Sequence, residues 1–141
     1  MAGFLTPLKL EYIDGHLWRI DAPFEYCVGS ADSSTNIIVP AGFFTDFASV
    51  HRFFWRVLPP TGTYGKAAVV HDYLYQHPYL TDYSDEEALG GTTWPVSRKT
   101  CDDIFLEAMK VLEVQAWKRN TMYCAVRVGG WKPWNDYRKS E

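Results

Sequence analysis

The chain has 141 residues, of which 47% are hydrophobic, and its formal net charge at pH 7 is −3. A chain of this size can bury about two-thirds of its unfolded surface, so we expect a single domain over residues 1–141. Because acidic and basic residues are interspersed and the net charge is negative, a nucleic-acid partner is disfavoured. No stretch approaches membrane-spanning length, and three widely spaced cysteines favour reduced thiols, so we expect a cytoplasmic protein.

Residues 8–48 are expected to be rich in strands. Runs of apolar and β-branched residues predict four short strands, at residues 8–13, 16–20, 24–28 and 36–39. Asp14-Gly15 lies between the first two runs and is typical of a hairpin turn. This part of the chain therefore predicts a small N-terminal antiparallel β-meander.

Residues 49–128 are expected to be mainly helical. Caps, breakers and helical spacing predict a short helix and three longer ones, at residues 50–57, about 67–77, 97–112 and 115–128. Residues 78–96 are rich in Gly, Thr and acids and are expected to form a loop insertion. The aromatic tail, residues 129–141, should pack back on the domain. The predicted class is α+β, with the strands packed against three to four C-terminal helices.

One predicted helix carries polar groups in a run that is otherwise small and apolar, Ala67-Ala68-Val69-Val70-His71-Asp72-Tyr73-Leu74-Tyr75. Burial of such groups is costly unless they are hydrogen-bonded or take part in chemistry. On a helix, His71 and Tyr75 lie one above the other, and Asp72 lies about 100° round from His71. A partner on a neighbouring element could therefore contact His71.

The expected partner is Asp102, on the helix that Ser97 caps. Asp102 lies at the edge of the apolar face of that helix, whereas the adjacent Asp103 points toward water. A carboxylate that binds one imidazole nitrogen leaves the other nitrogen able to take a proton from water. His71, Asp102 and Tyr75 are therefore candidate catalytic residues of a hydrolase.

A divalent cation could supply the electrophile for such a reaction. Asp72 could bind calcium or zinc and so polarise a carbonyl or phosphoryl oxygen, with Asp46 as a second candidate ligand. These residues also have plainer interpretations. Asp46 or Ser49 can cap the helix at residues 50–57, and a His71–Asp102 contact is more often a satisfied core pair than a catalytic dyad.

Four segments, taken in order, resemble one protein family found in phages and prophages and catalogued as domain of unknown function thirteen fifty-three. They are Phe44–Val50, Ala67–Tyr75, Ser97-Arg98 with Asp102 and Ile104-Phe105, and Met122–Arg127. The resemblance covers most of the chain and implies no established activity. The chain departs from the family pattern at His51, where the family usually has proline, and in the greater length of residues 78–96.

The segment His71-Asp72-x-x-Tyr75 is also similar to the H-D-x-x-Y helix of secreted phospholipases A2. In those enzymes the His is the general base, the Asp binds calcium, and the Tyr and an Asp on the facing helix orient the His. The similarity implies these roles for His71, Asp72, Tyr75 and Asp102. The glycine-rich, disulfide-held calcium loop of those enzymes has no counterpart in this sequence.

The sequence leaves three functions open. The first is a phage-encoded, metal-assisted hydrolase of a cell-envelope component, either lipid or peptidoglycan. The second is a non-catalytic virion or assembly component that binds other phage proteins, in which the His/Asp cluster is structural. The third is a host-directed inhibitor that acts by binding. In each case we expect synthesis in the host cytoplasm, and the second function would also place the protein in the virion.

Overall fold

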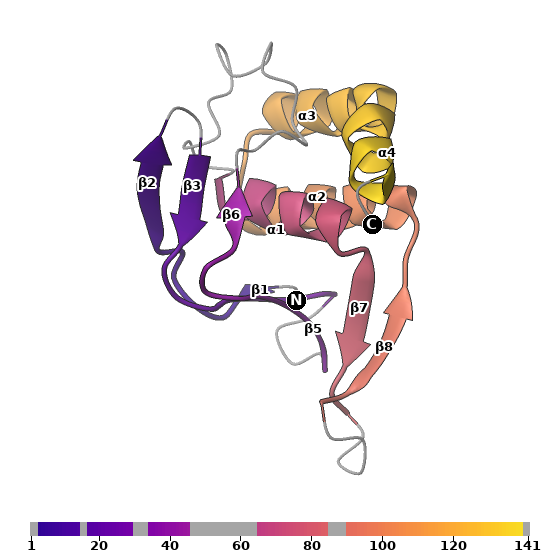
Figure 1. The fold of residues 1–141 in the computed structure, drawn as a ribbon. Coiled ribbons are helices and arrows are strands. Elements are labelled where there is room, and N and C mark those ends of the chain that lie inside the picture. Colours follow the sequence, from indigo (N-terminus) through magenta and orange to yellow (C-terminus); the bar gives the residue numbers. More distant parts are fainter. Residues whose placement is uncertain (1–2, 15–16, 30–33, 46–64, 85–89, 140–141) are drawn as a thin grey trace. The chain divides into compact units, whose positions relative to one another are not determined.

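The architecture is that of a computed structural model (Figure 1), which describes residues 3–14, 17–29, 34–45, 65–84 and 90–139. The chain divides into two compact units. The first comprises residues 1–46 and 79–96 and holds the described strands, and the second comprises residues 47–78 and 97–141 and holds the described helices. The predicted α+β class is confirmed, whereas the single domain expected over residues 1–141 stays a prediction.

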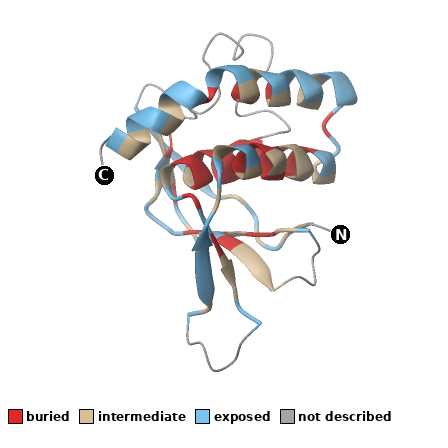
Figure 2. Cartoon of the chain, turned by 90° about the vertical axis from the view of Figure 1, so that its right-hand side faces the viewer, coloured by how far each residue is buried: buried red, intermediate tan, exposed pale blue. Residues whose placement is uncertain are grey.

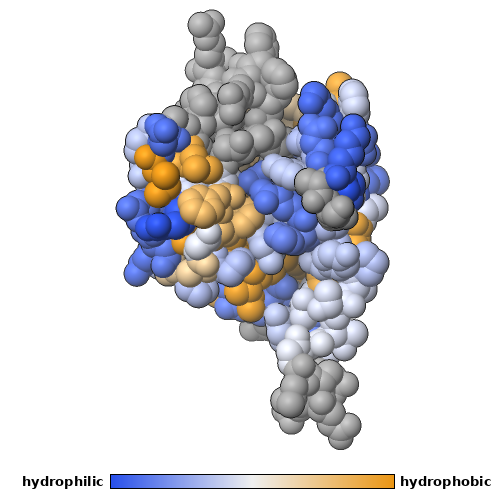
Figure 3. All heavy atoms as spheres, in the orientation of Figure 1, coloured by the Kyte–Doolittle hydropathy of each residue, from blue (hydrophilic) through white to orange (hydrophobic). Residues whose placement is uncertain are grey.

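The first unit contains a three-stranded antiparallel sheet in the order β2-β3-β6. Its strands are β2 (Leu10–Asp14), β3 (Leu17–Ile20) and β6 (Phe44–Thr45). The pairing of β2 with β3 confirms the predicted hairpin. The chain returns to β3 through a turn at Gly42, where φ is +90° and the N–H donates to the Ile20 carbonyl at 2.7 Å. Figure 3 shows hydrophobic side chains at the surface over this sheet, where Ile13 and Phe44 are exposed.

The same unit contains a five-stranded antiparallel sheet in the order β1-β4-β5-β7-β8, so the strands form two sheets rather than one meander. Its strands are β1 (Gly3–Phe4), β4 (Phe24–Cys27), β5 (Thr35–Val39), β7 (Tyr79–Asp82) and β8 (Thr92–Pro95). The prediction of a loop over residues 78–96 is therefore wrong at residues 79–82 and 92–95, which form strands. Strand β7 pairs with β5 as well as with β8, and no local pattern reveals a partner so distant in the sequence.

The second unit contains four described helices: α1 (Gly65–Gln76), α2 (Arg98–Val111), α3 (Ala116–Gly129) and α4 (Trp131–Lys139). The three longer predicted helices are confirmed to within a few residues. Ser97 caps α2 as expected, because its side chain accepts a hydrogen bond from the Thr100 N–H. The short helix expected at residues 50–57, with its proposed cap at Asp46 or Ser49, lies outside the described residues.

Helix α1 is the core of the second unit. Figure 2 shows it buried along most of its length, including the polar His71 and Asp72. The aromatic tail forms α4 and packs back on α1 as expected, with the Trp134 ring centroid 5.3 Å from that of Tyr75 in an edge-on contact. None of the helices in the described ranges is long and apolar enough to cross a membrane.

Candidate functional site

The buried polar groups of the second unit meet at Asp102. The His71 Nε2 atom lies 2.7 Å from Asp102 Oδ1, and the Tyr75 hydroxyl donates to the same oxygen at 2.6 Å. The exposed fraction of each of these three residues is 0%. As the helical spacing predicts, the His71 and Tyr75 rings lie together, with centroids 4.2 Å apart. The structure therefore brings the three candidate catalytic residues into one contact group.

Two arginines approach the other oxygen of Asp102. Arg127 of α3 donates to Oδ2 at 2.7 Å, and Arg98, one turn before Asp102 on α2, lies 3.5 Å from it. The Arg98 guanidinium also donates to the backbone carbonyls of Val126 at 2.9 Å and Arg127 at 3.3 Å. Asp102 thus links α1, α2 and α3, and both of its carboxylate oxygens accept hydrogen bonds.

Burial and these donors set the charge state of the cluster. Burial raises the pKa of Asp102, but the hydrogen bonds from His71, Tyr75 and Arg127 outweigh burial and hold that pKa below its usual value. Burial also lowers the pKa of His71, and the neighbouring Asp102 only partly opposes this. The pKa of Tyr75 is raised, first by burial and then by Asp102. At neutral pH the cluster therefore combines an ionised Asp102 with a neutral His71 and a neutral Tyr75.

The proton on His71 can be assigned from this charge state. An ionised carboxylate only accepts hydrogen bonds, so the His71 Nε2 atom that faces Asp102 must carry the proton. In the neutral ring the other nitrogen, Nδ1, then holds the basic lone pair. The ring is held in place by Phe105 of α2, whose ring centroid is 4.6 Å away. This is the tautomer that a general base positioned by a carboxylate requires.

Asp72 lies on a different side of α1 from this contact group. Its Oδ1 accepts a hydrogen bond from the Tyr137 hydroxyl at 3.2 Å, and its Oδ2 accepts one from the Gln76 amide at 3.3 Å. Within the part of the chain that the structure describes, no group of three or more His, Cys, Asp or Glu side chains could hold a metal ion. Asp46 lies outside the described residues. The described donors therefore do not fit a calcium or zinc ion.

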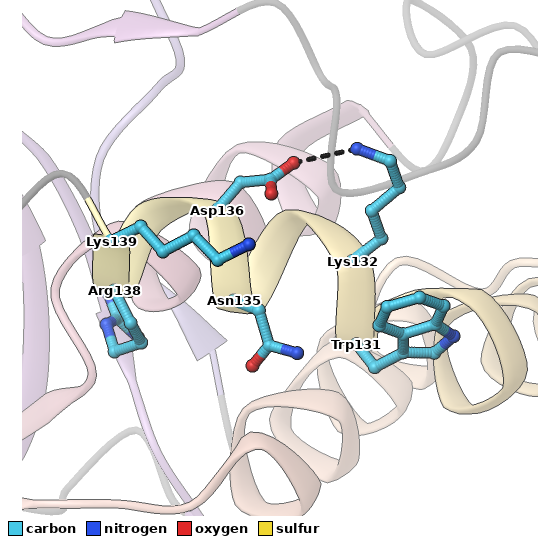
Figure 4. Close-up of a pocket in the computed structure, with 6 residues that line it drawn as sticks. All are labelled: Trp131, Lys132, Asn135, Asp136, Arg138 and Lys139. Atoms are coloured by element: carbon cyan, nitrogen blue, oxygen red, sulfur yellow. Dashed lines mark hydrogen bonds and ion pairs between the residues drawn. The ribbon is translucent and has the colours of Figure 1, made fainter.

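A pocket lies on α4 (Figure 4). Its lining consists of Trp131, Lys132, Asn135, Asp136, Arg138 and Lys139. Figure 4 shows the ion pair between Lys132 and Asp136, whose Nζ and Oδ2 atoms are 2.9 Å apart. Neither His71 nor Asp102 contributes to this pocket.

Comparison with known proteins places the chain in a family. A family model described as "Protein of unknown function (DUF1353)" matches residues 18–126. The chain belongs to this family. This confirms the resemblance found in the sequence motifs, whereas the phospholipase similarity stays a prediction. No curated protein and no solved structure matches the chain. The DUF1353 match includes His71 and Asp102, and it ends one residue before Arg127.

Arg98, Arg127 and Tyr137 are members of the polar network that the sequence reasoning did not select. Arg98 had a local signal, because it stands four residues before Asp102 and so on the same side of the helix. Arg127 and Tyr137 had none, because they reach Asp102 and Asp72 from other helices. Both arginines also lie in the segments that resemble the DUF1353 family.

Proposed function

We propose that this protein is a hydrolase in which His71 is the general base and Asp102 is its positioning residue. The observation that carries the proposal is the 2.7 Å contact between His71 Nε2 and Asp102 Oδ1. The proposed substrate is a component of the cell envelope, either lipid or peptidoglycan, and the proposed source of the protein is a phage. The similarity to the H-D-x-x-Y helix and the resemblance to phage and prophage proteins support these last two points.

The chemistry follows from the protonation of the cluster. The His71 Nδ1 atom takes a proton from a water molecule while the water oxygen attacks the carbonyl carbon of an ester or amide. The imidazolium that forms is stabilised by the ionised Asp102 at its other nitrogen. The same proton then passes to the leaving oxygen or nitrogen as the carbon–oxygen or carbon–nitrogen bond breaks, and His71 returns to its neutral form.

Tyr75 and Arg127 support this role by fixing the carboxylate. Tyr75 shares Oδ1 with His71, and Arg127 occupies Oδ2 at 2.7 Å, so Asp102 has little freedom to rotate away from the imidazole. The hydrogen bond from Arg127 also helps to keep the pKa of Asp102 low, and only the ionised carboxylate holds the required tautomer.

A second candidate function is favoured by the burial of the cluster. His71 and Asp102 are fully buried, and four side chains from three helices converge on Asp102. A network of this kind ties helices together without any chemistry. On this observation the alternative is a non-catalytic virion or assembly component in which the cluster is structural.

The test is an assay for fatty-acid release from phospholipid vesicles and for peptide release from purified peptidoglycan. His71→Gln keeps an N–H that can donate to Asp102 but removes the basic nitrogen, and the matched control is His77→Gln, at an exposed histidine just beyond α1. We expect His71→Gln to lose at least about a hundredfold in turnover, as expected for removal of a general base. His77→Gln should match the parent protein.

Three outcomes separate the proposals. Equal turnover by a folded His71→Gln protein would remove His71 from the mechanism. An absence of turnover by the parent protein on both substrates would reject the hydrolase and favour the structural role. The cation expected from the sequence is tested by measuring turnover with added calcium, with added zinc and with a chelator. Turnover by the parent protein that requires the added ion, together with turnover by Asp72→Asn that does not respond to it, would support a metal-assisted form.

A further inference from the structure

The outward face of α3 is an uncharged stripe. Trp117, Thr121, Cys124 and Val128, spaced four, three and four residues apart, lie along one side of this helix. All four are exposed, with 55% of Trp117 and 77% of Val128 accessible. Trp131, at the start of α4, is 57% exposed. Figure 2 shows that both helices present long exposed faces. We call these five residues the α3–α4 stripe.

Two polar groups within the stripe have hydrogen-bond partners in the protein itself. The Thr121 hydroxyl donates to the Trp117 backbone carbonyl at 2.6 Å, and the Trp117 indole N–H donates to Gln115 Oε1 at 3.0 Å. A donor that already has a partner can enter an apolar environment without becoming unsatisfied, so the Trp117 and Thr121 part of the stripe can do so. The α3–α4 stripe is therefore suited to partial insertion among lipid chains.

Charge is distributed unevenly along the chain. Residues 115–141 contain six of the 14 basic residues and two of the 17 acidic residues, so this segment has a net charge of +4 and the rest of the chain has −7. The two helices that carry the stripe also carry three lysines, of which Lys132 is ion-paired with Asp136. Lys118 Nζ lies 5.6 Å from the centre of the Trp117 ring, while Lys132 and Lys139 line the α4 pocket shown in Figure 4. The helices of the apolar stripe thus also carry cations, as an interfacial helix does.

We propose that the α3–α4 stripe binds the surface of a lipid bilayer that contains anionic phospholipid. Tryptophan favours the boundary between headgroups and acyl chains, and lysines beside it meet the negative headgroups. The proposal does not depend on hydrolysis by His71, because none of the stripe residues belongs to the Asp102 cluster.

Two other occupants fit the stripe less well. A second copy of the chain would bring two segments of net charge +4 together, and like charges repel. A nucleic acid would be expected to engage arginines, but Arg119 donates to the Val114 carbonyl and Arg127 binds Asp102. The −7 charge of the rest of the chain would also repel an extended polyanion, whereas a bilayer meets only one face.

The test is co-sedimentation of the full chain with phosphatidylcholine vesicles, with and without phosphatidylglycerol. We expect binding to the anionic vesicles only, weakened by added salt. The double variant Trp117→Ala/Val128→Ser should weaken that binding by at least about tenfold. The matched control is Trp94→Ala, which removes an exposed tryptophan from β8 of the other unit and should leave binding unchanged.

A second variant isolates the charges, since Lys118→Gln/Lys139→Gln leaves the stripe intact and should weaken binding by about fivefold for each lysine. His71→Gln should bind vesicles as the parent does, which separates this proposal from the hydrolase. Equal binding to both kinds of vesicle, or an equal loss in Trp94→Ala, would overturn the proposal. If the protein does not bind vesicles but forms a dimer that Trp117→Ala abolishes, the stripe binds a second copy of the chain. If the protein binds DNA more tightly than it binds anionic vesicles, the stripe binds nucleic acid.

Discussion

The two sides of α2 offer a direct comparison, because adjacent aspartates face different surroundings. Each carboxylate accepts a hydrogen bond from a tyrosine hydroxyl and from a basic side chain. The partners are Tyr75 and Arg127 for Asp102, and Tyr123 and Lys99 for Asp103. The exposed fraction of the side chain is 0% for Asp102 and 45% for Asp103. The pKa of each carboxyl lies below its usual value, in each case through hydrogen bonds that outweigh burial.

The difference shows that burial, rather than the kind of partner, determines how much such a group contributes to the free energy of unfolding. Water can replace a lost partner of Asp103, so its ion pair contributes little to stability. Around Asp102 no water can do so, and a missing partner leaves a buried donor or charge unsatisfied. Asp102 on the buried side also contacts His71, the one titrating base among the partners of the two aspartates. The proposed chemistry is therefore placed on this side of α2.

The largest expected effect is that of Asp102→Asn. This change removes the negative charge that Arg127 and Arg98 approach and replaces an acceptor with an amide that also donates. We expect the free energy of unfolding to fall by about 3–5 kcal/mol, as for other broken buried ion pairs. Urea denaturation followed by circular dichroism measures it.

The matched control is Asp103→Asn, one residue away on the same helix. Because the Asp103 side chain is partly exposed, we expect the free energy of unfolding to fall by only a small fraction of the decrease expected for Asp102→Asn. Equal losses in the two variants would show that burial does not distinguish the two sides of α2.

Two adjacent glycines provide an intermediate effect. A Cβ atom at Gly130 would collide with the Tyr75 hydroxyl and the Val126 carbonyl and lie 3.1 Å from Arg98 Nη1, so it would disturb the buried cluster. At Gly129 a Cβ atom would have nothing within 4 Å. We expect Gly130→Ala to destabilise the protein by about 1–3 kcal/mol. Gly129→Ala should be neutral or stabilise the helix by up to about 1 kcal/mol. Thermal unfolding of both variants measures the contrast, and similar melting temperatures would contradict it.

Much of the helical unit could be predicted from the sequence, because its signals are local. The repeat of apolar residues along α2 identified its buried face and placed Asp102 on that face and Asp103 off it. The four-residue spacing of His71 and Tyr75 likewise placed their rings together. Local periodicity was sufficient for these features because a helix completes its own backbone hydrogen bonds.

The features that sequence reasoning missed depend on contacts between distant segments. Strands β7 and β8 are short, and the pairing of β7 with β5 depends on residues more than forty positions away in the chain, such as Thr35 with Asp82. Arg127 likewise reaches Asp102 from another helix. Its charge and intermediate position on α3 give no sign of a buried partner, because arginines at such positions are mostly solvated.

The smallest expected effect is a pH dependence of stability that belongs to the buried side alone. Burial lowers the pKa of His71 below its ordinary 6.5, so below pH 6.5 the unfolded chain takes up a proton that folded His71 does not. The free energy of unfolding should therefore fall as the pH drops from 6.5, by up to about 1.4 kcal/mol per pH unit, until the pH reaches the folded pKa of His71. Asp102 adds a separate loss below its ordinary pKa of 3.8, because its folded pKa is also lowered.

His71→Gln distinguishes these two windows. The variant has no titrating group at position 71, so its stability should change less between pH 6.5 and pH 3.8, while the loss below pH 3.8 should remain. Urea denaturation at a series of pH values measures the two curves. If the parent protein and His71→Gln lose stability in parallel across the upper window, His71 does not take its neutral form from burial. The neutral state of His71 at pH 7 would then rest on its ordinary pKa of 6.5 and not on a shift caused by burial.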